Sequence, residues 1–189
     1  ATAMTIVPSM TQKGAQVTMV QRSPTYVVSR PAEDKIANTL RKWLPEKWAY
    51  AITRLKNTTL SGYFYRQTRS QPAKTKAQLL GMATANLGEE MVKAHFTPSY
   101  NPWDQRMCLI PDGDLYQSIN EGSAQVVTGD IETWTEQGLV MKDGTEVTGD
   151  IIVTATGITL TVMSGIAFDL DGTAINFPDT FTYKGMMYS

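Results

Sequence analysis

The sequence has only one cysteine, Cys108, and only one histidine, His95, among its 189 residues. A single cysteine excludes an internal disulfide, a redox pair of cysteines and a metal site that needs several cysteines. A single histidine permits a Ser-His-Asp triad only if His95 happens to lie beside a suitable nucleophile. We therefore expect no metal site, and we interpret both residues as structural.

Long apolar runs are also absent, since the sequence has no stretch of 18 consecutive apolar residues. A membrane-spanning helix needs about 20 such residues, so none is predicted. The sequence shows no signal peptide, and we expect a cytoplasmic location. Because the first residues already read as a helix and no start methionine precedes them, we expect a piece of a longer protein.

The net charge is only −1, but its distribution is uneven. Residues 30–76 hold eleven Lys and Arg against three Asp and Glu, a balance of +8, whereas the rest of the chain holds six against fifteen. Aromatic residues are interleaved with this basic block, namely Trp43, Trp48, Tyr50, Tyr63 and Tyr65. Such a block forms a solvated helical face, or it contacts anionic lipid or nucleic acid. Because the charges are spread over amphipathic helices, we favour the solvated face, expect no nucleic-acid partner and leave peripheral membrane contact open.

The first half of the chain reads as helix, strand and then more helix. Residues 3–12 predict a helix that Lys13-Gly14 ends, and residues 16–21 predict a buried strand. Together they form the second half of a βαβ unit, whose first strand we expect just before Ala1. Residues 32–95 predict a helical insert with a break at Gln71-Pro72, and residues 96–114, rich in proline, predict a loop.

The second half predicts a short helix at 115–119 and then mostly short strands. Strands at 124–128, 131–135, 138–141 and 146–147 indicate a β-meander, with a hairpin turn at Asp143-Gly144. The apolar run 151–156 predicts a core strand buried on both faces, and residues 167–170 and 175–177 predict a hairpin. The fold class is therefore α/β, a Rossmann-like parallel sheet with a helical insert at about 30–95 and a meander at about 124–150.

Two places predict contacts with a dinucleotide. Thr2 and Ala3 open the first helix, where the tail of a Gly-x-Gly-x-x-Ala fingerprint would face a pyrophosphate. Arg22 and Ser23 follow the first strand, where an Arg suits the 2′-phosphate of NADP because its planar fork bonds two phosphate oxygens. The alternative for the first place is an ordinary surface helix. The alternative for the second is a solvated Arg22 before a proline turn.

Two further segments carry residues typical of functional sites. The loop from Tyr100 to Arg106 is rich in proline and aromatics, and it either carries function or covers the core. The stretch containing Asp169 and Asp171 resembles the nucleophile motif of haloacid-dehalogenase-type phosphatases. Because only 16 residues follow Thr173, a β-hairpin with an Asp-Gly turn is the preferred interpretation.

Taken in order, these pieces resemble the class B flavin-dependent monooxygenases, the Baeyer–Villiger group, and especially their ethionamide-activating type. The resemblance rests on Gln-Arg-Ser-Pro-Thr-Tyr at 21–26, Pro-Trp-Asp-x-Arg at 102–106 and Ile-Ile-Val-Thr-Ala-Thr-Gly at 151–157. It covers nearly the whole chain and implies an NADPH-binding domain with its helical insert, across residues 1–189. The parent enzyme would use NADPH and FAD to insert oxygen into a ketone, or to oxidise a sulfide, through a flavin peroxide.

The resemblance also implies roles for single residues. Arg22 and Ser23 match the pair that binds the 2′-phosphate, and Arg106 matches a catalytic arginine at the flavin. Gln105 stands where many relatives carry a lysine that helps to hold this phosphate. Ala155, Thr156 and Gly157 match the cofactor-binding stretch that returns the chain toward the FAD domain. Since the Gly-x-Gly-x-x-Gly fingerprint of that domain is absent, we expect the isolated chain to be inactive.

Overall fold

The structure is a computed structural model that describes residues 2–105, 107–158, 165–176, 179–183 and 187–188. The chain divides into two units, Ala1–Thr154 and Ala155–Ser189, and each is described by itself. The described residues form six α-helices, two small parallel sheets and several antiparallel pairs of strands. The class is therefore mixed α/β, as predicted.

The chain begins with helix α1 (Thr2–Thr11), which packs against strand β1 (Val17–Gln21). Met4 and Val7, three residues apart on α1, are buried in the core. Gly14 ends the turn after the helix with φ +88°, a conformation that glycine adopts without steric cost, and its N–H donates to the Thr11 carbonyl over 2.9 Å. The predicted succession of helix, turn and strand is confirmed.

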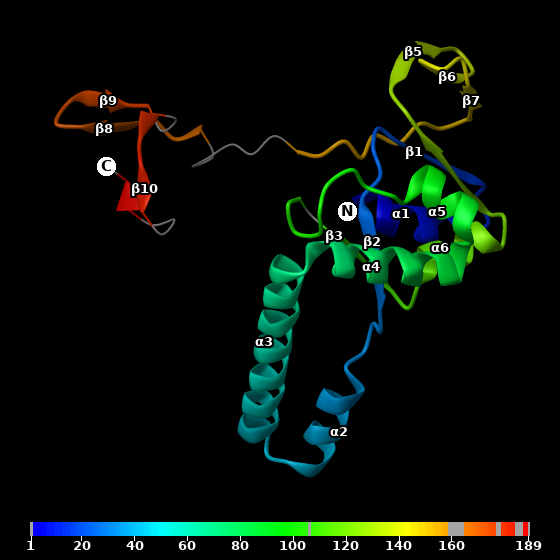
Figure 1. Cartoon of the computed structure of the whole chain (residues 1–189). Coiled ribbons are helices and arrows are strands. Elements are labelled where there is room, and N and C mark those ends of the chain that lie inside the picture. Colours follow the sequence, from blue (N-terminus) through cyan, green and yellow to red (C-terminus); the bar gives the residue numbers. More distant parts are fainter. Residues whose placement is uncertain (1, 106, 159–164, 177–178, 184–186, 189) are drawn as a thin grey trace. The chain divides into compact units, whose positions relative to one another are not determined.

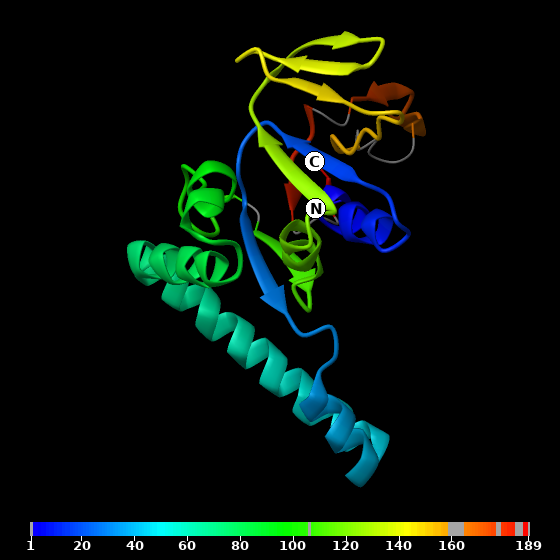
Figure 2. The same cartoon turned by 90° about the vertical axis from the view of Figure 1, so that its right-hand side faces the viewer.

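Four strands form the two parallel sheets. β1 pairs with β4 (Ala124–Thr128), and the two strands lie side by side in Figure 2. The register sets Gln21 opposite Thr128. β2 (Tyr26–Arg30) pairs with β3 (Met107–Pro111). One hydrophobic cluster spans both sheets, with Met19, Val27, Cys108, Ile110 and Val126 among its members. Parallel pairing is thus present, whereas a continuous Rossmann-like sheet stays a prediction.

The pairing of β2 with β3 corrects the prediction that residues 96–114 are all loop. Within β3, Cys108 and Ile110 are buried, while Leu109 between them is 62% exposed. This alternation is typical of a strand with one covered face. Proline residues on both sides made the segment look like a loop, and its strand partner lies about 80 residues earlier. β1 is likewise buried on one face only, since Thr18 is exposed beside the buried Met19.

The helices predicted within residues 32–95 are present, with their break at Gln71. They are α2 (Lys35–Trp43), α3 (Glu46–Ser70), α4 (Pro72–Leu87) and α5 (Glu89–His95). Ala83 of α4 and Val92 of α5 belong to the core cluster. The α2–α3 hairpin instead extends away from the sheets (Figure 1).

Helix α6 (Asp114–Asn120) follows as predicted. The antiparallel meander has three strands rather than the four predicted, because residues 124–128 pair in parallel with β1 instead. The meander comprises β5 (Ile131–Thr135), β6 (Gly138–Met141) and β7 (Glu146–Thr148). Its Asp143-Gly144 turn is closed by the Thr145 N–H, which donates to the Asp143 carboxylate over 2.9 Å. This hydrogen bond lowers the pKa of Asp143.

The second unit contains two short antiparallel hairpins. β8 (Phe168–Leu170) pairs with β9 (Thr173–Ile175), and β10 (Thr182–Tyr183) pairs with β11 (Met187–Tyr188). Asp171 and Gly172 turn the first hairpin with φ of 50° and 81°. Positive φ at both positions is typical of a type I′ turn, so the predicted Asp-Gly hairpin is confirmed, although Phe177 lies outside the described residues.

Residues 151–156, predicted as a core strand, form no strand. Ile151 is 78% exposed and Val153 is 52% exposed, so the run is not buried on both faces. An apolar, β-branched run becomes a strand only if a neighbour completes its hydrogen bonds. None of the described strands pairs with this run, and the prediction was wrong for the structure of this chain.

Candidate functional site

The first turn of α1 and the end of β1 lie at the same edge of the β1–β4 sheet. The chain runs along α1, reverses at Gly14 and returns along β1, so helix and strand are antiparallel. Their lengths match, since ten helical residues rise about 15 Å and five strand residues extend about 17 Å. Ligands of open α/β sheets bind outside the carboxyl ends of parallel strands, so this edge is the candidate site.

Thr2 and Ala3 lie in the first turn of α1. Ala3 is partly buried and packs against the core cluster, so a small side chain lets the start of α1 approach the sheet closely. Thr2 is exposed, and its backbone carbonyl accepts a hydrogen bond from the Thr5 hydroxyl over 2.9 Å. The backbone N–H groups of the first helical turn have no partner within the helix. Because α1 and β1 run antiparallel, these groups lie at the same edge as the end of β1.

Arg22 and Ser23 leave β1 directly at this edge, and both are exposed. Within the described residues, neither side chain has a hydrogen-bond or ion-pair partner. A guanidinium and a hydroxyl are thus available to an anionic ligand. The turn that carries the pair lies close in space to the loop that precedes β3, because Thr25 Oγ1 lies 2.9 Å from the Tyr100 hydroxyl.

Gln21 anchors the turn that carries Arg22. Its side-chain amide donates to the His95 carbonyl over 2.7 Å and to Thr128 Oγ1 over 2.9 Å. Its own carbonyl accepts the Gly129 N–H over 2.9 Å. The direction in which Arg22 and Ser23 leave the sheet is therefore set by the ends of α5 and β4.

His95 completes this arrangement, although its sequence suggested no function. His95 Nδ1 lies 2.8 Å from Thr128 Oγ1, so the ring lies beside the ends of β1 and β4. Burial lowers the pKa of His95 below its ordinary value, which favours the neutral ring. The only sequence signal was that His95 is the sole histidine, and the residues it contacts are 33 and 74 positions away.

The loop from Tyr100 is braced on its β2 side by tyrosines. The Tyr26 hydroxyl donates to the Tyr100 carbonyl over 2.6 Å, and the two rings meet edge to face with centroids 5.4 Å apart. Burial raises the pKa of Tyr26, and the nearby Tyr100 and Asp104 raise it further. Lys76 donates to the carbonyl of Pro98, a buried residue, over 2.9 Å.

On its other side the loop is held by α3. Arg69 forms an ion pair of 2.6 Å with Asp104, and this hydrogen bond lowers the pKa of the Asp104 carboxyl. The Trp103 ring meets the Tyr65 ring edge to face at 5.8 Å. Trp103 is nonetheless 47% exposed, so it packs on α3 rather than covering the core. The loop is thus a fixed element rather than a simple core cover.

For the remaining predicted site residues the roles stay predictions. Gln105 is exposed at the end of the braced loop, whereas Arg106 lies outside the described residues. Ala155, Thr156 and Gly157 belong to the second unit, where Ala155 is partly buried and the other two are exposed. Gly157 has φ +108°, a conformation that only glycine adopts readily.

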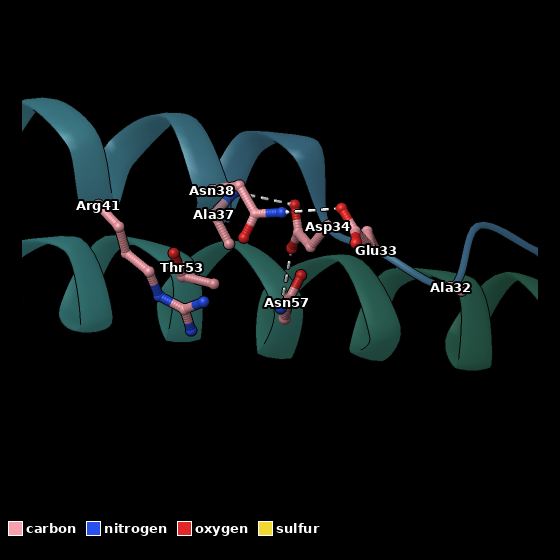
Figure 3. A pocket seen from close by; sticks show the side chains of 8 residues that line it. All are labelled: Ala32, Glu33, Asp34, Ala37, Asn38, Arg41, Thr53 and Asn57. Atoms are coloured by element: carbon pink, nitrogen blue, oxygen red, sulfur yellow. Dashed lines mark hydrogen bonds between the residues drawn. The ribbon is translucent and has the colours of Figure 1, made fainter.

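A polar groove lies between α2 and α3, in the hairpin rather than at the candidate edge (Figure 3). It encloses about 400 Å³ and is lined by residues that include Arg41, Thr53 and Asn57. Asp34 caps α2 through the Ala37 N–H and forms an ion pair of 2.6 Å with Lys56. The hydrogen bonds from Lys56 and Ala37 lower the pKa of Asp34 to about 2. This carboxylate is already engaged, which makes its role structural.

The structure does not support the alternative of a basic module for membrane or nucleic acid. That alternative predicted one continuous basic face, yet several cations of residues 30–76 are engaged within the chain. Lys56 and Arg69 are ion-paired, and Lys76 donates to a backbone carbonyl. The Arg30 guanidinium lies 5.5 Å from the centre of the Phe64 ring. No described helix is both long and apolar enough to cross a bilayer.

The structure also favours the hairpin interpretation of the Asp169 motif. Asp169 accepts the Gly172 N–H over 3.3 Å and so helps to close the turn. Both Asp169 and Asp171 are exposed. Among the described residues no three His, Cys, Asp or Glu side chains gather as metal ligands, so the magnesium site of a phosphatase has no counterpart there.

Comparison with known proteins gives the class of the chain. No family model and no solved structure matches it. Curated proteins that match it over its whole length are FAD-containing monooxygenases, and the chain is therefore a segment of a protein of this family, as the sequence motifs indicated. The chain spans about two fifths of the length of these relatives.

Three relatives show the extent of the similarity. The chain is 44% identical over 191 aligned residues to the FAD-containing monooxygenase EthA of Mycobacterium tuberculosis, covering 100% of the chain and 39% of EthA. It is 41% identical to the putative FAD-containing monooxygenase MymA of the same species, covering 99% of the chain and 39% of MymA. It is 42% identical to the probable FAD-binding monooxygenase AlmA of Acinetobacter baylyi, covering 100% of the chain and 38% of AlmA.

Proposed function

We propose that this chain supplies the NADPH-binding domain of an FAD-dependent monooxygenase. The observation that carries the proposal is the edge formed by the start of α1 and the end of β1. There, exposed Arg22 and Ser23 offer a guanidinium and a hydroxyl that no described side chain engages. An arginine at this position suits the 2′-phosphate of NADP, and the first turn of α1 suits a pyrophosphate.

The donors at this edge fit the dinucleotide better than they fit a flavin. Arg22 would hold the 2′-phosphate through paired N–H groups, and Ser23 would add a third hydrogen bond. The small Ala3 lets the start of α1 pack closely on the sheet, which would keep the first helical turn at this edge. FAD would be held by the rest of the parent protein, because this chain lacks a Gly-x-Gly-x-x-Gly fingerprint. When bound, the flavin would supply the oxygen-transfer chemistry.

The parent would oxidise a small molecule, a ketone or a sulfide, in the cytoplasm. The oxidation of a small molecule rests on the names of the relatives, and the ketone or sulfide rests on the family resemblance to which the motif at 102–106 contributes. The braced loop would hold Gln105 in place at its end. Arg106 would be a permanent cation near the reacting centre, because a guanidinium stays charged at any working pH.

Binding measurements on the parent protein test the proposal. We expect purified, FAD-loaded parent to bind NADP⁺ more tightly than NAD⁺ in isothermal titration calorimetry. The 189-residue chain by itself should purify without FAD absorbance and consume no oxygen with NADPH. Equal affinity of the parent for both nucleotides, or no binding of either, would contradict the assignment of the Arg22 edge.

A further inference from the structure

The hydrogen bonds around Gln21 determine where the ring hydrogen of His95 lies. The Gln21 amide nitrogen has two hydrogens, and one of them must go to the His95 carbonyl, which is only an acceptor. The second hydrogen goes to Thr128 Oγ1. Thr128 therefore donates its own hydrogen to His95 Nδ1, 2.8 Å away. Nδ1 of His95 is therefore unprotonated and accepts this hydrogen bond, and the ring hydrogen is on Nε2.

The Nε2–H of His95 is consequently a free donor at the candidate edge. Within the described residues it has no hydrogen-bond partner, and the residue is only partly buried. β1 and β4, on which the ring rests, carry no charged residue, and the nearest cation on α5 is Lys93. His95 thus lies beside the end of the strand from which Arg22 and Ser23 emerge.

We propose that His95 is a ligand-binding residue, whose Nε2–H donates to the 2′-phosphate of NADP together with Arg22 and Ser23. Thr128 and Gln21 are positioning residues that act through the His95 ring. The inference rests on the proposed NADPH function and adds a third recognition group to it. A neutral donor in a fixed orientation binds a phosphate oxygen without the cost of desolvating a partly buried cation.

The test compares nucleotide affinities of variants in the full-length, FAD-loaded parent, with NADP⁺ and NAD⁺ as probes in calorimetry. His95→Leu should weaken NADP⁺ binding roughly tenfold, as for a lost hydrogen bond to a charged group, and leave NAD⁺ within about twofold. Thr128→Val should have a similar effect, and the double variant should be no weaker than either single variant. Thr128→Ser, which keeps the hydroxyl, and His95→Gln, which keeps a donor, should each retain most of the affinity.

The outcomes separate this inference from the proposed function. If Arg22→Ala lowers NADP⁺ affinity selectively while His95→Leu and Thr128→Val do not, His95 is structural and the inference is wrong. The same holds if the His95 variants weaken both nucleotides equally. If Arg22→Ala also fails to discriminate between NADP⁺ and NAD⁺, the proposed function itself is wrong. Urea unfolding midpoints of each variant show whether the fold is retained.

Discussion

Tyr26 on β2 donates its phenolic hydrogen to the backbone carbonyl of Tyr100, 74 residues later, over 2.6 Å. The contact fixes the loop before β3 against the strand that follows the Arg22 turn. Tyr26 is 1% exposed, so the hydroxyl has no access to water if this bond is lost. This hydrogen bond, together with the contact between Thr25 Oγ1 and the Tyr100 hydroxyl, links the two segments that the sequence marked as functional.

Tyr26→Phe should lower the free energy of unfolding by about 1 kcal/mol, the usual net value of such a bond plus the cost of an unpaired carbonyl. Urea unfolding should show this loss as a lower midpoint, while the dependence of the unfolding free energy on urea concentration stays unchanged. Tyr63→Phe is a matched control, because Tyr63 is 58% exposed on α3. Equal stability of Tyr26→Phe and wild type would mean that the other contacts of the loop are sufficient to hold it.

Ionisation of Tyr116 should lower the free energy of unfolding in alkaline solution. Burial raises the pKa of Tyr116 to about 12, and its hydroxyl donates to the Val27 carbonyl over 2.9 Å. The folded state keeps the proton more tightly than the unfolded chain, whose tyrosine pKa is about 10. This contribution is complete below pH 10, and it is lost as pH rises toward 12. Unfolding followed by circular dichroism should show a steeper alkaline loss for the wild type than for Tyr116→Phe.

Gly138→Ala should destabilise the meander. A Cβ at Gly138 would lie 2.0 Å from the Val147 carbonyl oxygen, a backbone atom that cannot move aside without breaking the β6–β7 pairing. We expect a loss of about 3 kcal/mol or more, measured by thermal unfolding. Gly81→Ala on α4 is the control, because nothing lies within 4 Å of that Cβ. It should raise stability by about 0.5–1 kcal/mol through helix propensity.

Arg22→Ala in the parent should weaken NADPH binding far more than NADH binding. A charge-assisted phosphate contact contributes about 1.5–3 kcal/mol, which corresponds to a factor of roughly 10 to 150 in affinity. Arg41→Ala serves as a control, since Arg41 is an exposed arginine in the groove between α2 and α3. An equal loss for both nucleotides would indicate that Arg22 supports only the fold.

Arg106→Ala in the parent should leave flavin reduction by NADPH measurable and abolish oxygenation of the substrate. The reason is electrostatic, because a fixed guanidinium stabilises negative charge that develops in a site with little water. Arg106→Lys should restore activity only in part, since an ammonium lacks the planar fork. Stopped-flow absorbance separates the two steps. Oxygenation by the alanine variant at the wild-type rate would remove Arg106 from the catalytic residues.

Local interactions made several features of this protein predictable from its sequence. Gly14 ends α1, Asp143-Gly144 and Asp171-Gly172 turn hairpins, and Gln71-Pro72 divides the helical insert. Each depends on the conformational preference of one or two residues, which acts whatever the rest of the chain does. The ordered motifs also sufficed to indicate the monooxygenase family.

Tertiary structure alone decided which segments pair and which polar groups meet. Residues 107–111 became a strand because β2 supplies their hydrogen bonds, whereas the more strand-like run 151–156 has no partner among the described strands. The same applies to His95, which looked incidental until the ends of β1 and β4 brought Gln21 and Thr128 to it. Hydrogen bonds between segments 33 to 107 residues apart depend on how the whole chain closes, and local residue preferences carry no information about that closure.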